Sequence, residues 1–321
     1  MHGDNTAALE PPTTKSEPED GRTPIMSSLA KAKPLIMASA YRVGVVQMTS
    51  TDDCLLNYET CARLAAKASA QNCQFLSFPE CFHFIGGGKT GLRSLDIAED
   101  LEGSTIHKYQ QLARETNMTL SLGGFQEKSR DPKKVYNTHV IINSNGDLIS
   151  TYKKIHLFDF PDGGLMESSF TIAGDEAKVV KCEQGINFGL STCYDLRFPE
   201  LYQVLRSLEA NVMLIPSAFT EKTGVAHWHI LCRARAIETQ SYVLAAAQGG
   251  AHNEKRTSFG HALIIDPWGN IVAEGEKNEM MSSGSQLLVA DLDLELIQQI
   301  RQKMPIEIHK RHDVYEQRAK E

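Results

Sequence analysis

The sequence predicts a mixed α/β fold in which two β-sheets pack together and helices cover their outer faces. Short apolar runs alternate with stretches of helical periodicity in two parts of the chain, and a turn-forming Asn145-Gly146 pair joins two further strands as a hairpin. No linker-like break follows residue 41. The 321 residues therefore divide into an N-terminal extension at residues 1–40 and one large domain at residues 41–321.

The extension differs in composition from the rest of the chain. It contains five prolines and little apolar periodicity, so we expect it to be disordered. Its five acidic residues stand against a single arginine, Arg22, which is unlike the Arg-rich, acid-poor composition of a transit peptide. We therefore expect a cytoplasmic protein. An organellar form that uses the extension, or a shorter form that begins at Met26 or Met37, stays open.

In the first half of the domain, apolar runs predict strands at residues 43–48, 75–78, 119–125, 136–143 and 147–152. Apolar residues at i, i+3, i+4 and i+7 predict a helix with its N-cap among residues 51–53; they are Cys61, Leu64, Ala65 and Ala68. Ile106, Tyr109 and Ala113 mark a second helix, which is expected to be capped by Ser104.

The second half repeats the alternation. Strands are expected at residues 188–193, 212–215, 243–247, 263–266, 271–273 and 287–291. Two helices are expected between them. Apolar periodicity marks the first at Leu201, Val204, Leu205 and Leu208, and the second carries Ile230, Ala234 and Ile237.

The composition excludes several classes of partner. The net charge of −7 argues against a nucleic-acid surface, which usually carries a basic excess. No apolar run approaches the ~20 residues of a membrane span, so we expect neither a nucleic-acid nor a membrane partner. The seven cysteines form no C-x-x-C pair, which favours a reducing compartment and buried thiols over a disulfide framework or a zinc knuckle.

Cys193 is the candidate nucleophile. A strand is expected to run into it, and Phe198-Pro199-Glu200 is expected to open a helix shortly after it. The thiol would then lie at a strand-to-helix corner, where free backbone N–H groups and a helix dipole favour a thiolate or an oxyanion. A buried structural cysteine is the alternative that this local pattern leaves open.

Two further strand ends offer charged groups. Glu80 follows a strand and a proline, and neighbouring aromatic side chains would desolvate its carboxylate and raise its pKa toward the range of a general base. Lys154 also follows a strand, and it could lower the pKa of a nearby thiol and donate to an oxyanion. Taken singly, each is better explained as a solvated surface charge. Because ligands gather at the carboxyl ends of strands in α/β sheets, we expect the three side chains to meet.

Three other patterns give weaker evidence for a functional site. Gly88-Lys89-Thr90 lacks the glycine that a phosphate-binding loop needs five residues earlier, where His83 stands. His227 and His229 are two positions apart, so they do not share a helix face, and no other His or Cys cluster has zinc spacing. No metal and no cofactor are therefore expected. No papain-type or caspase-type signature surrounds Cys193, so a Cys–His protease is not favoured.

Three segments resemble the glutamate, lysine and cysteine signatures of the nitrilase superfamily of carbon–nitrogen hydrolases, and they occur in that family's order. They are Phe78-Pro79-Glu80, Tyr152-Lys153-Lys154-Ile155-His156-Leu157 and Thr192-Cys193-Tyr194-Asp195-Leu196-Arg197-Phe198-Pro199-Glu200. The resemblance covers residues 41–315. Further segments resemble the Nit-type branch of amidases, at residues 216–219, 226–228, 233–240, 252–256, 260–261 and 266–269.

The resemblance implies a four-layer α-β-β-α sandwich, and a homodimer or higher homo-oligomer in which sandwiches stack. It implies an amidase that hydrolyses the ω-carboxamide of a small α-keto acid through a cysteine thioester. Cys193 would attack, Glu80 would act as base and then as acid toward leaving ammonia, and Lys154 with the Tyr194 N–H would hold the oxyanion. Glu167 matches the family's second catalytic glutamate, although residues 160–164 before it look shorter than the family's loop.

The substrate is expected to contact Tyr194, Arg197, Phe219 and Thr223. Arg197 and Thr223 would meet its carboxylate, because a guanidinium pairs bidentately with that group, and Phe219 would pack on its carbon chain. A salt bridge that fixes the helix start is an equal alternative for Arg197. An amidase for another small amide, including an N-carbamoyl compound, stays open. So does a non-catalytic scaffold or signalling module, although the joint presence of Glu80, Lys154 and Cys193 favours an enzyme.

Overall fold

The computed structural model describes residues 41–161, 165–276 and 284–318. They lie within one compact unit, Ala40–Glu321. The predicted disorder of residues 1–40 falls outside the described residues, and the predicted domain boundary at residue 41 stays a prediction.

Within the described residues, the first sheet has eight strands. Its order is β13 (Thr257–Phe259), β12 (Ala247–Ala251), β1 (Tyr41–Met48), β2 (Phe75–Phe78), β3 (Thr119–Lys128), β4 (Val135–Ile142) and β5 (Leu148–Lys153), with β16 (Ser285–Leu292) also paired to β1. Strands β1, β2 and β3 are parallel, and β4 and β5 continue the sheet as antiparallel hairpins. The predicted Asn145-Gly146 turn joins β4 to β5, with Gly146 at a left-handed φ of 82°.

The second sheet has six strands among the described residues. Its order is β15 (Ile271–Glu274), β14 (Leu263–Ile265), β11 (Tyr242–Ala245), β10 (Val212–Leu214), β9 (Asn187–Leu190) and β8 (Val179–Lys181). Its central strands β9, β10 and β11 are parallel, and their register places Leu214 beside both Leu190 and Leu244. A small separate ribbon pairs β6 (Asp159–Phe160) with β7 (Leu165–Met166).

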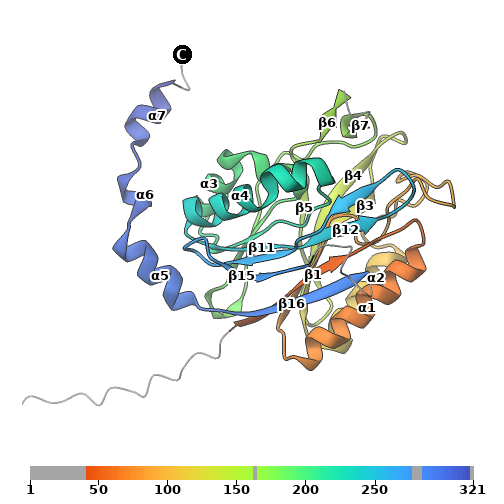
Figure 1. Ribbon diagram of the computed structural model, residues 1–321, viewed down its shortest axis with the longest axis horizontal. Coiled ribbons are helices and arrows are strands. Elements are labelled where there is room, and N and C mark those ends of the chain that lie inside the picture. The colour runs from red at the N-terminus through yellow and green to blue at the C-terminus, as the bar shows by residue number, and fades with distance from the viewer. Residues whose placement is uncertain (1–40, 162–164, 277–283, 319–321) are drawn as a thin grey trace, which may run out of the picture. The chain divides into compact units, whose positions relative to one another are not determined.

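Helices cover the outer face of each sheet (Figure 1). The first sheet carries α1 (Cys54–Ala70) and α2 (Ser104–Thr116), and the second carries α3 (Pro199–Ser207) and α4 (Glu221–Thr239). Helices α5 (Leu294–Lys303), α6 (Ile306–His309) and α7 (His312–Arg318) follow β16. The predicted four-layer α-β-β-α sandwich is confirmed.

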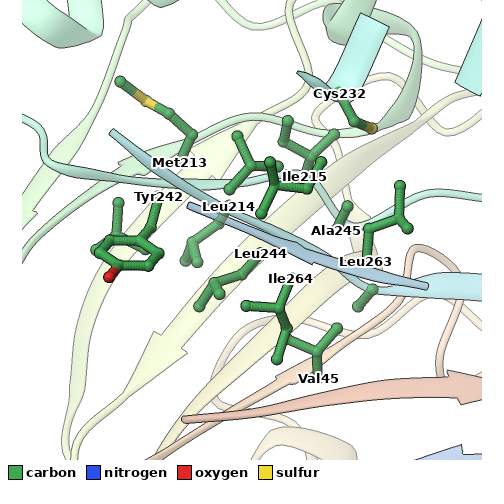
Figure 2. Close-up of a cluster of buried hydrophobic side chains, with 14 of the residues drawn as sticks. Val45, Met213, Leu214, Ile215, Cys232, Tyr242, Leu244, Ala245, Leu263 and Ile264 are labelled. Atoms are coloured by element: carbon green, nitrogen blue, oxygen red, sulfur yellow. The ribbon is translucent and has the colours of Figure 1, made fainter. Parts of the chain in front are cut away.

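The alternation of side chains along β1 shows how the layers are held together. Val43 and Val45 belong to the buried cluster that contains the second sheet, whereas Val46 and Met48 belong to the cluster beneath α1 and α2. Figure 2 shows Val45 in one cluster with side chains of the second sheet, including Leu244 and Ile264. The layer between the sheets is therefore filled by side chains from both.

The predicted helices are found, although one predicted cap is wrong. In α1, Asp53 is the N-cap and the predicted face is buried. In α2 the cap residue is Gly103 rather than Ser104, and the Glu99 carboxylate accepts the hydrogen bond from the Thr105 N–H at 2.9 Å. Some of the apolar residues that marked the next two helices are exposed: Val204 on α3, Leu208 at its C-cap, and Ile230 and Ile237 on α4.

The buried stripe of α4 mixes polar and apolar residues. It contains the polar residue Arg235, which is 3% exposed because its guanidinium donates to the carbonyl oxygen of Leu196 and pairs with Glu238. The other residues of the stripe are Gly224, Trp228, Cys232, Ala236 and Thr239. Three large apolar residues of α4 are instead exposed: Val225, Ile230 and Ile237.

Candidate active site

The ends of three strands bring Glu80, Lys154 and Cys193 together in one pocket. Glu80 lies just after β2, Lys154 directly follows β5, and Cys193 lies just after β9. Lys154 Nζ is 3.0 Å from Glu80 Oε1, and the Cys193 thiol forms a hydrogen bond with the same carboxylate. Each of the three residues is less than 10% exposed.

Glu167 contributes a second carboxylate to this pocket. Lys154 Nζ lies 2.8 Å from its Oε2 and 3.0 Å from its Oε1. A short 3-10 helix, Glu167–Ser169, carries the residue, and the Phe158 N–H donates to Oε2 at 2.7 Å. Glu167 thus touches the same ammonium as Glu80. Residues 162–164 of the preceding loop lie outside the described residues, so the expected shortening of that loop stays a prediction.

Asn137 belongs to the same group, although the sequence reasoning missed it. Its Nδ2 donates to Glu80 Oε1 at 2.9 Å and reaches Glu167 Oε1 at 3.4 Å. The approach requires Gly124, because a Cβ there would lie 2.8 Å from Asn137 Oδ1 and 2.9 Å from Glu80 Cγ. The available signal was a polar run, Asn137-Thr138-His139, in the middle of β4.

The backbone at Cys193 is held in a strained turn. Cys193 begins a 3-10 helix, Cys193–Arg197, with a left-handed φ of 50° that a non-glycine residue keeps only where its surroundings enforce it. Its N–H donates to the carbonyl oxygen of Pro216 at 2.9 Å. The expected strand through Cys193 is therefore wrong: β9 ends at Leu190, and the helix opened by Pro199 starts only after this turn.

A buried carboxylate, Asp195, fixes the turn from behind. It accepts hydrogen bonds from the Thr192 N–H at 2.8 Å, from the Tyr152 hydroxyl at 2.6 Å, and from the N–H and Nδ1 of His156 at 3.0 Å and 2.7 Å. Thr192 precedes the nucleophile candidate, whereas Tyr152 and His156 flank Lys154. Asp195 therefore connects the two strand ends that carry Cys193 and Lys154.

A second pocket meets the first at Cys193 and contains the four residues expected to contact substrate: Tyr194, Arg197, Phe219 and Thr223. The Arg197 guanidinium lies 5.5 Å from the Phe219 ring centroid and 5.7 Å from that of Tyr194. It shares a 3.1 Å hydrogen bond with His227 Nδ1. No carboxylate in the described part of the chain pairs with it, so the alternative of a salt bridge at the helix start is not observed.

Comparison with known proteins decides the family. Residues 42–302 match the model of the family described as carbon-nitrogen hydrolase. The chain belongs to the carbon–nitrogen hydrolase family. It is 43% identical over 289 residues to deaminated glutathione amidase of Dictyostelium discoideum, with 88% of this chain and 97% of that protein covered. The human protein of the same name is 41% identical over 307 residues, with 92% and 91% covered.

Solved structures agree with this assignment. The crystal structure of the Caenorhabditis elegans NitFhit protein has a TM-score of 0.79 and 42% identity, covering 87% of this chain and 67% of that one. Nit3 of Saccharomyces cerevisiae, described as a member of branch 10 of the nitrilase superfamily, has a TM-score of 0.70 and 30% identity, covering 82% and 94%. The expected membership of the nitrilase superfamily is thereby confirmed.

The charges in this carbon–nitrogen hydrolase site depend on one another. Burial would raise the pKa of Glu80, but the Lys154 ammonium and hydrogen bonds, including those from Cys193 and Asn137, outweigh burial and hold the pKa below its ordinary value. Burial and the Glu80 charge raise the pKa of the Cys193 thiol well above its ordinary value, although Lys154 and the Ala218 N–H act in the opposite direction. Burial would lower the pKa of Lys154, but Glu80 and Glu167 raise it well above its ordinary value.

Two sequence-based expectations about these charges are corrected. The pKa of Glu80 was expected to rise through desolvation, yet the site that buries Glu80 also brings Lys154 to it. Lys154 was expected to lower the thiol pKa of Cys193, and it does so only in part, because burial and Glu80 dominate. At neutral pH the hydrolase therefore holds an ionised Glu80, a charged Lys154 and a protonated thiol.

Histidines do not enter the hydrolase pockets. None of the described residues that line the two pockets is a histidine, so no Cys–His pair forms there. His229 lies beside another histidine instead: His229 Nε2 contacts Glu274 Oε1 at 2.8 Å, where His261 Nδ1 contacts the same oxygen at 2.7 Å. His229, His261 and Glu274 form a group of possible metal ligands that the sequence spacing did not indicate. The hydrogen bonds to Glu274 are sufficient to explain why these three side chains lie together.

In the part of the chain that the structure describes, no helix combines the length and the hydropathy needed to cross a membrane.

Proposed function

We propose that this carbon–nitrogen hydrolase is a deaminated glutathione amidase that works through a thioester at Cys193. The observation that carries the proposal is the Lys154 ammonium, which contacts Glu80 at 3.0 Å and Glu167 at 2.8 Å beside the Cys193 thiol. A nucleophile, a base and an oxyanion donor thereby share one buried pocket. Relatives named deaminated glutathione amidase, at 41% and 43% identity over most of the chain, support this substrate.

The chemistry of this substrate changes one expectation. Deaminated glutathione has a keto group in place of the glutamyl amino group, and its ω-amide nitrogen belongs to the cysteine residue. Hydrolysis therefore yields 2-oxoglutarate and cysteinylglycine. The leaving group is the amino group of a dipeptide, not the ammonia expected from the sequence, so the site must accommodate a chain on each side of the scissile bond.

Acylation follows from the charges of the free site. Because the Cys193 thiol is protonated and Glu80 is ionised at neutral pH, Glu80 takes the thiol proton as sulfur attacks the amide carbon. Lys154 Nζ and the Tyr194 N–H hold the resulting oxyanion. The C–N bond then breaks, Glu80 returns its proton to the leaving nitrogen, and a thioester remains on Cys193.

Deacylation uses the same groups with water in place of the thiol. Glu80 takes a proton from water, the hydroxide oxygen attacks the thioester carbon, and the carbon–sulfur bond breaks. The proton on Glu80 returns to sulfur, which restores the starting state and releases 2-oxoglutarate. Glu167 keeps Lys154 in place by sharing its ammonium throughout.

The second pocket fits the 2-oxoglutarate portion. Arg197 offers a guanidinium without a carboxylate partner among the described residues, and Thr223 lies in the first turn of α4, whose N-terminal end favours an anion. Phe219 and Tyr194 both place an aromatic ring near that guanidinium, with the ring centroids at 5.5 Å and 5.7 Å. We therefore propose Arg197 and Thr223 for the α-carboxylate, with Phe219 and Tyr194 against the carbon chain.

The proposed activity is tested by measuring both products of the reaction. Purified protein is incubated with deaminated glutathione, and 2-oxoglutarate and cysteinylglycine are quantified over time. We expect equal amounts of both from the wild type and from Cys54→Ala, which removes a thiol outside the pocket, and neither from Cys193→Ala. Formation of the products by Cys193→Ala would contradict the mechanism.

Two alternatives are separated by further arms of the same assay. Faster turnover of α-ketoglutaramate, read as ammonia release, would make the protein an ω-amidase with the same mechanism. No turnover of any small amide, together with a Cys193 that reacts with iodoacetamide no faster than the other six cysteines, would indicate a scaffold or signalling module. The Glu80, Lys154 and Cys193 contacts favour the enzyme.

We propose a homodimer or higher homo-oligomer formed through the exposed side of α3 and α4. Large apolar residues are exposed there: Val204 on α3, Leu208 at its C-cap, and Val225, Ile230 and Ile237 on α4, with Ile230 70% exposed. Exposed apolar surface of this kind marks association sites. Ile230→Asp is expected to shift the mass in light scattering toward a monomer, and the exposed Ile308→Asp serves as control. An unchanged mass for Ile230→Asp would contradict this surface.

We also propose a cytoplasmic location, which the seven free cysteines support because a reducing compartment keeps thiols unpaired. Fractionation of cells that express the full chain tests this. Recovery mainly in an organelle would favour a role for residues 1–40 in targeting.

A further inference from the structure

The side chain of Arg256 lines both pockets that meet at Cys193. Its positive charge acts on the thiol of Cys81, which directly follows Glu80. In the described part of the chain, its guanidinium has no carboxylate partner; only its backbone N–H has an assigned acceptor, Asn253 Oδ1. A second guanidinium besides Arg197 is thus available beside the nucleophile candidate.

The loop that carries Arg256 is fixed by its own hydrogen bonds. It joins β12 to β13, and Asn253 Oδ1 accepts from the N–H groups of both Lys255 and Arg256 at 2.9 Å. Asn253 Nδ2 also donates to the carbonyl oxygen of Gly86 at 3.1 Å, which ties the loop to the segment after Glu80. The His252 N–H donates to the Arg256 carbonyl oxygen at 2.9 Å. Arg256 is therefore presented from a backbone that is ordered before substrate binds.

The two pockets differ in which side of the amide they can hold. Glu80 lines the first pocket and not the second. Because Glu80 must return a proton to the leaving nitrogen, the leaving group has to occupy the first pocket. The acyl portion then occupies the second, beside Arg197. Arg256 stands at the junction, where a leaving group that extends away from Glu80 comes within its reach.

We propose that Arg256 binds the carboxylate of the leaving dipeptide, so that the site recognises an amide with a carboxylate on each side of the scissile bond. The inference rests on the proposed function and names its substrate class. The glycine carboxylate of cysteinylglycine lies two residues beyond the scissile nitrogen, about 7 Å in an extended chain. A guanidinium binds such a group bidentately, which an ammonium does not.

The experiment compares two substrates that differ only at this carboxylate. Deaminated glutathione and its C-terminal glycinamide are tested on the wild type, Arg256→Gln, Arg256→Lys and Lys255→Gln. The last variant removes a neighbouring charge that lines neither pocket. α-Ketoglutaramate, which has no leaving-group carboxylate, reports on the integrity of the remaining site.

We expect Arg256→Gln to lower kcat/KM for deaminated glutathione about 10- to 100-fold, the range of a hydrogen bond to a charged group. The wild type should show a similar loss with the glycinamide, and Arg256→Gln should add no further loss on that substrate. Arg256→Lys should recover only part of the activity, Lys255→Gln should match the wild type, and turnover of α-ketoglutaramate should be unchanged.

Two results would overturn the inference while the proposed function stands. If Arg256→Gln lowers kcat/KM for α-ketoglutaramate as much as for deaminated glutathione, Arg256 binds the acyl carboxylate with Arg197. If wild type and Arg256→Gln hydrolyse deaminated glutathione equally well, Arg256 contributes no subsite. A wild type that does not hydrolyse deaminated glutathione would instead refute the proposed function, and the inference with it.

Discussion

The hydroxyl of Tyr152 donates a 2.6 Å hydrogen bond to Oδ2 of Asp195. Tyr152 lies at the end of β5, two residues before Lys154, and Asp195 lies two residues after Cys193. The bond is buried, since Tyr152 is 1% exposed and Asp195 is fully covered. It therefore couples the position of the ammonium to the strained turn of the nucleophile candidate, and it does so from outside the pocket.

Tyr152→Phe tests this coupling. The substitution leaves Asp195 its three donors from Thr192 and His156, so the protein should fold with a loss of about 1–3 kcal/mol in the free energy of unfolding, the value of a hydrogen bond to a charged group. We expect kcat to fall while KM stays close to that of the wild type. Urea unfolding and steady-state kinetics measure both, with the half-buried Tyr58→Phe as control. A loss of stability with unchanged kcat would assign Tyr152 a purely structural role.

Glu167→Gln should separate the roles of the two carboxylates. Lys154 keeps Glu80 as a partner at 3.0 Å, so the site should stay assembled while kcat falls about 10²–10³-fold, as for a weakened oxyanion donor. Glu80→Gln removes the proposed proton acceptor, so it should also abolish rapid alkylation of Cys193 by iodoacetamide, which Glu167→Gln should retain. Glu127→Gln, which neutralises the carboxylate beside Lys153 outside the pocket, is the matched control. Equal alkylation rates in the Glu80 and Glu167 variants would contradict this division.

The pH profile of kcat/KM should have a wide plateau. The acid limb reports the pKa of Glu80, which lies below its ordinary value because Lys154 and the hydrogen bonds outweigh burial. The alkaline limb reports Lys154 or Cys193, whose pKa values are both raised well above the ordinary ones. An acid limb near pH 6, above the ordinary carboxyl range, would mean instead that burial of Glu80 dominates.

Stability should follow the same limits. Folding lowers the pKa of Glu80, so the ionised carboxylate stabilises the fold at any pH above the pKa of Glu80 in the unfolded chain. This stabilisation is lost as the pH falls through the pKa of Glu80 in the folded protein. Folding raises the pKa of Lys154, so the charged ammonium stabilises the fold at any pH below the pKa of Lys154 in the unfolded chain. This stabilisation is lost as the pH rises through the pKa of Lys154 in the folded protein. Thermal unfolding across pH would show both losses outside the plateau of activity.

Phe188→Ala should weaken the contact between the sheets. Phe188 on β9 stacks on Phe75 of β2 with ring centroids 4.2 Å apart, and both residues are fully buried. Removing one ring should cost about 3–5 kcal/mol in the free energy of unfolding. Because the two rings contact each other, the double variant with Phe75→Ala should lose less than the sum of the single losses. Urea unfolding of the wild type, both single variants and the double variant measures these losses. Phe160→Ala truncates a partly exposed ring and serves as the control, which should lose little stability.

The sequence predicted where the strands end because the signals that stop a strand lie within a few neighbouring residues. Apolar runs stopped by Pro79, and the turn at Asn145-Gly146, are readable over a few residues, so the positions of Glu80 and Lys154 at the ends of strands were correctly predicted. The nucleophile turn was harder. Apolar residues continue toward Cys193, but its left-handed φ of 50° depends on hydrogen bonds that the Pro216 carbonyl oxygen and the Asp195 carboxylate accept. Pro216 is distant in the sequence, so no local pattern indicates its contact.

The second helical layer shows a different limit. Hydrophobic periodicity marks α4 by Ile230, Ala234 and Ile237, whereas the structure buries Arg235 and exposes both isoleucines. An arginine can be buried only where a distant acceptor, here the carbonyl oxygen of Leu196, satisfies its guanidinium. Periodicity contains no information about that acceptor.

The sequence by itself determined the α/β class, most strands, the family resemblance and the three chemical groups Glu80, Lys154 and Cys193, because each is written in a short stretch of residues. Only the tertiary structure decided that Asn137 and Gly124 complete the pocket, that Asp195 joins two strand ends, and that Arg256 reaches both pockets. It also decided the sign of the pKa shift at Glu80. Burial and an ammonium act on that carboxylate in opposite directions, and which of them prevails depends on a distance between groups 74 residues apart in the chain.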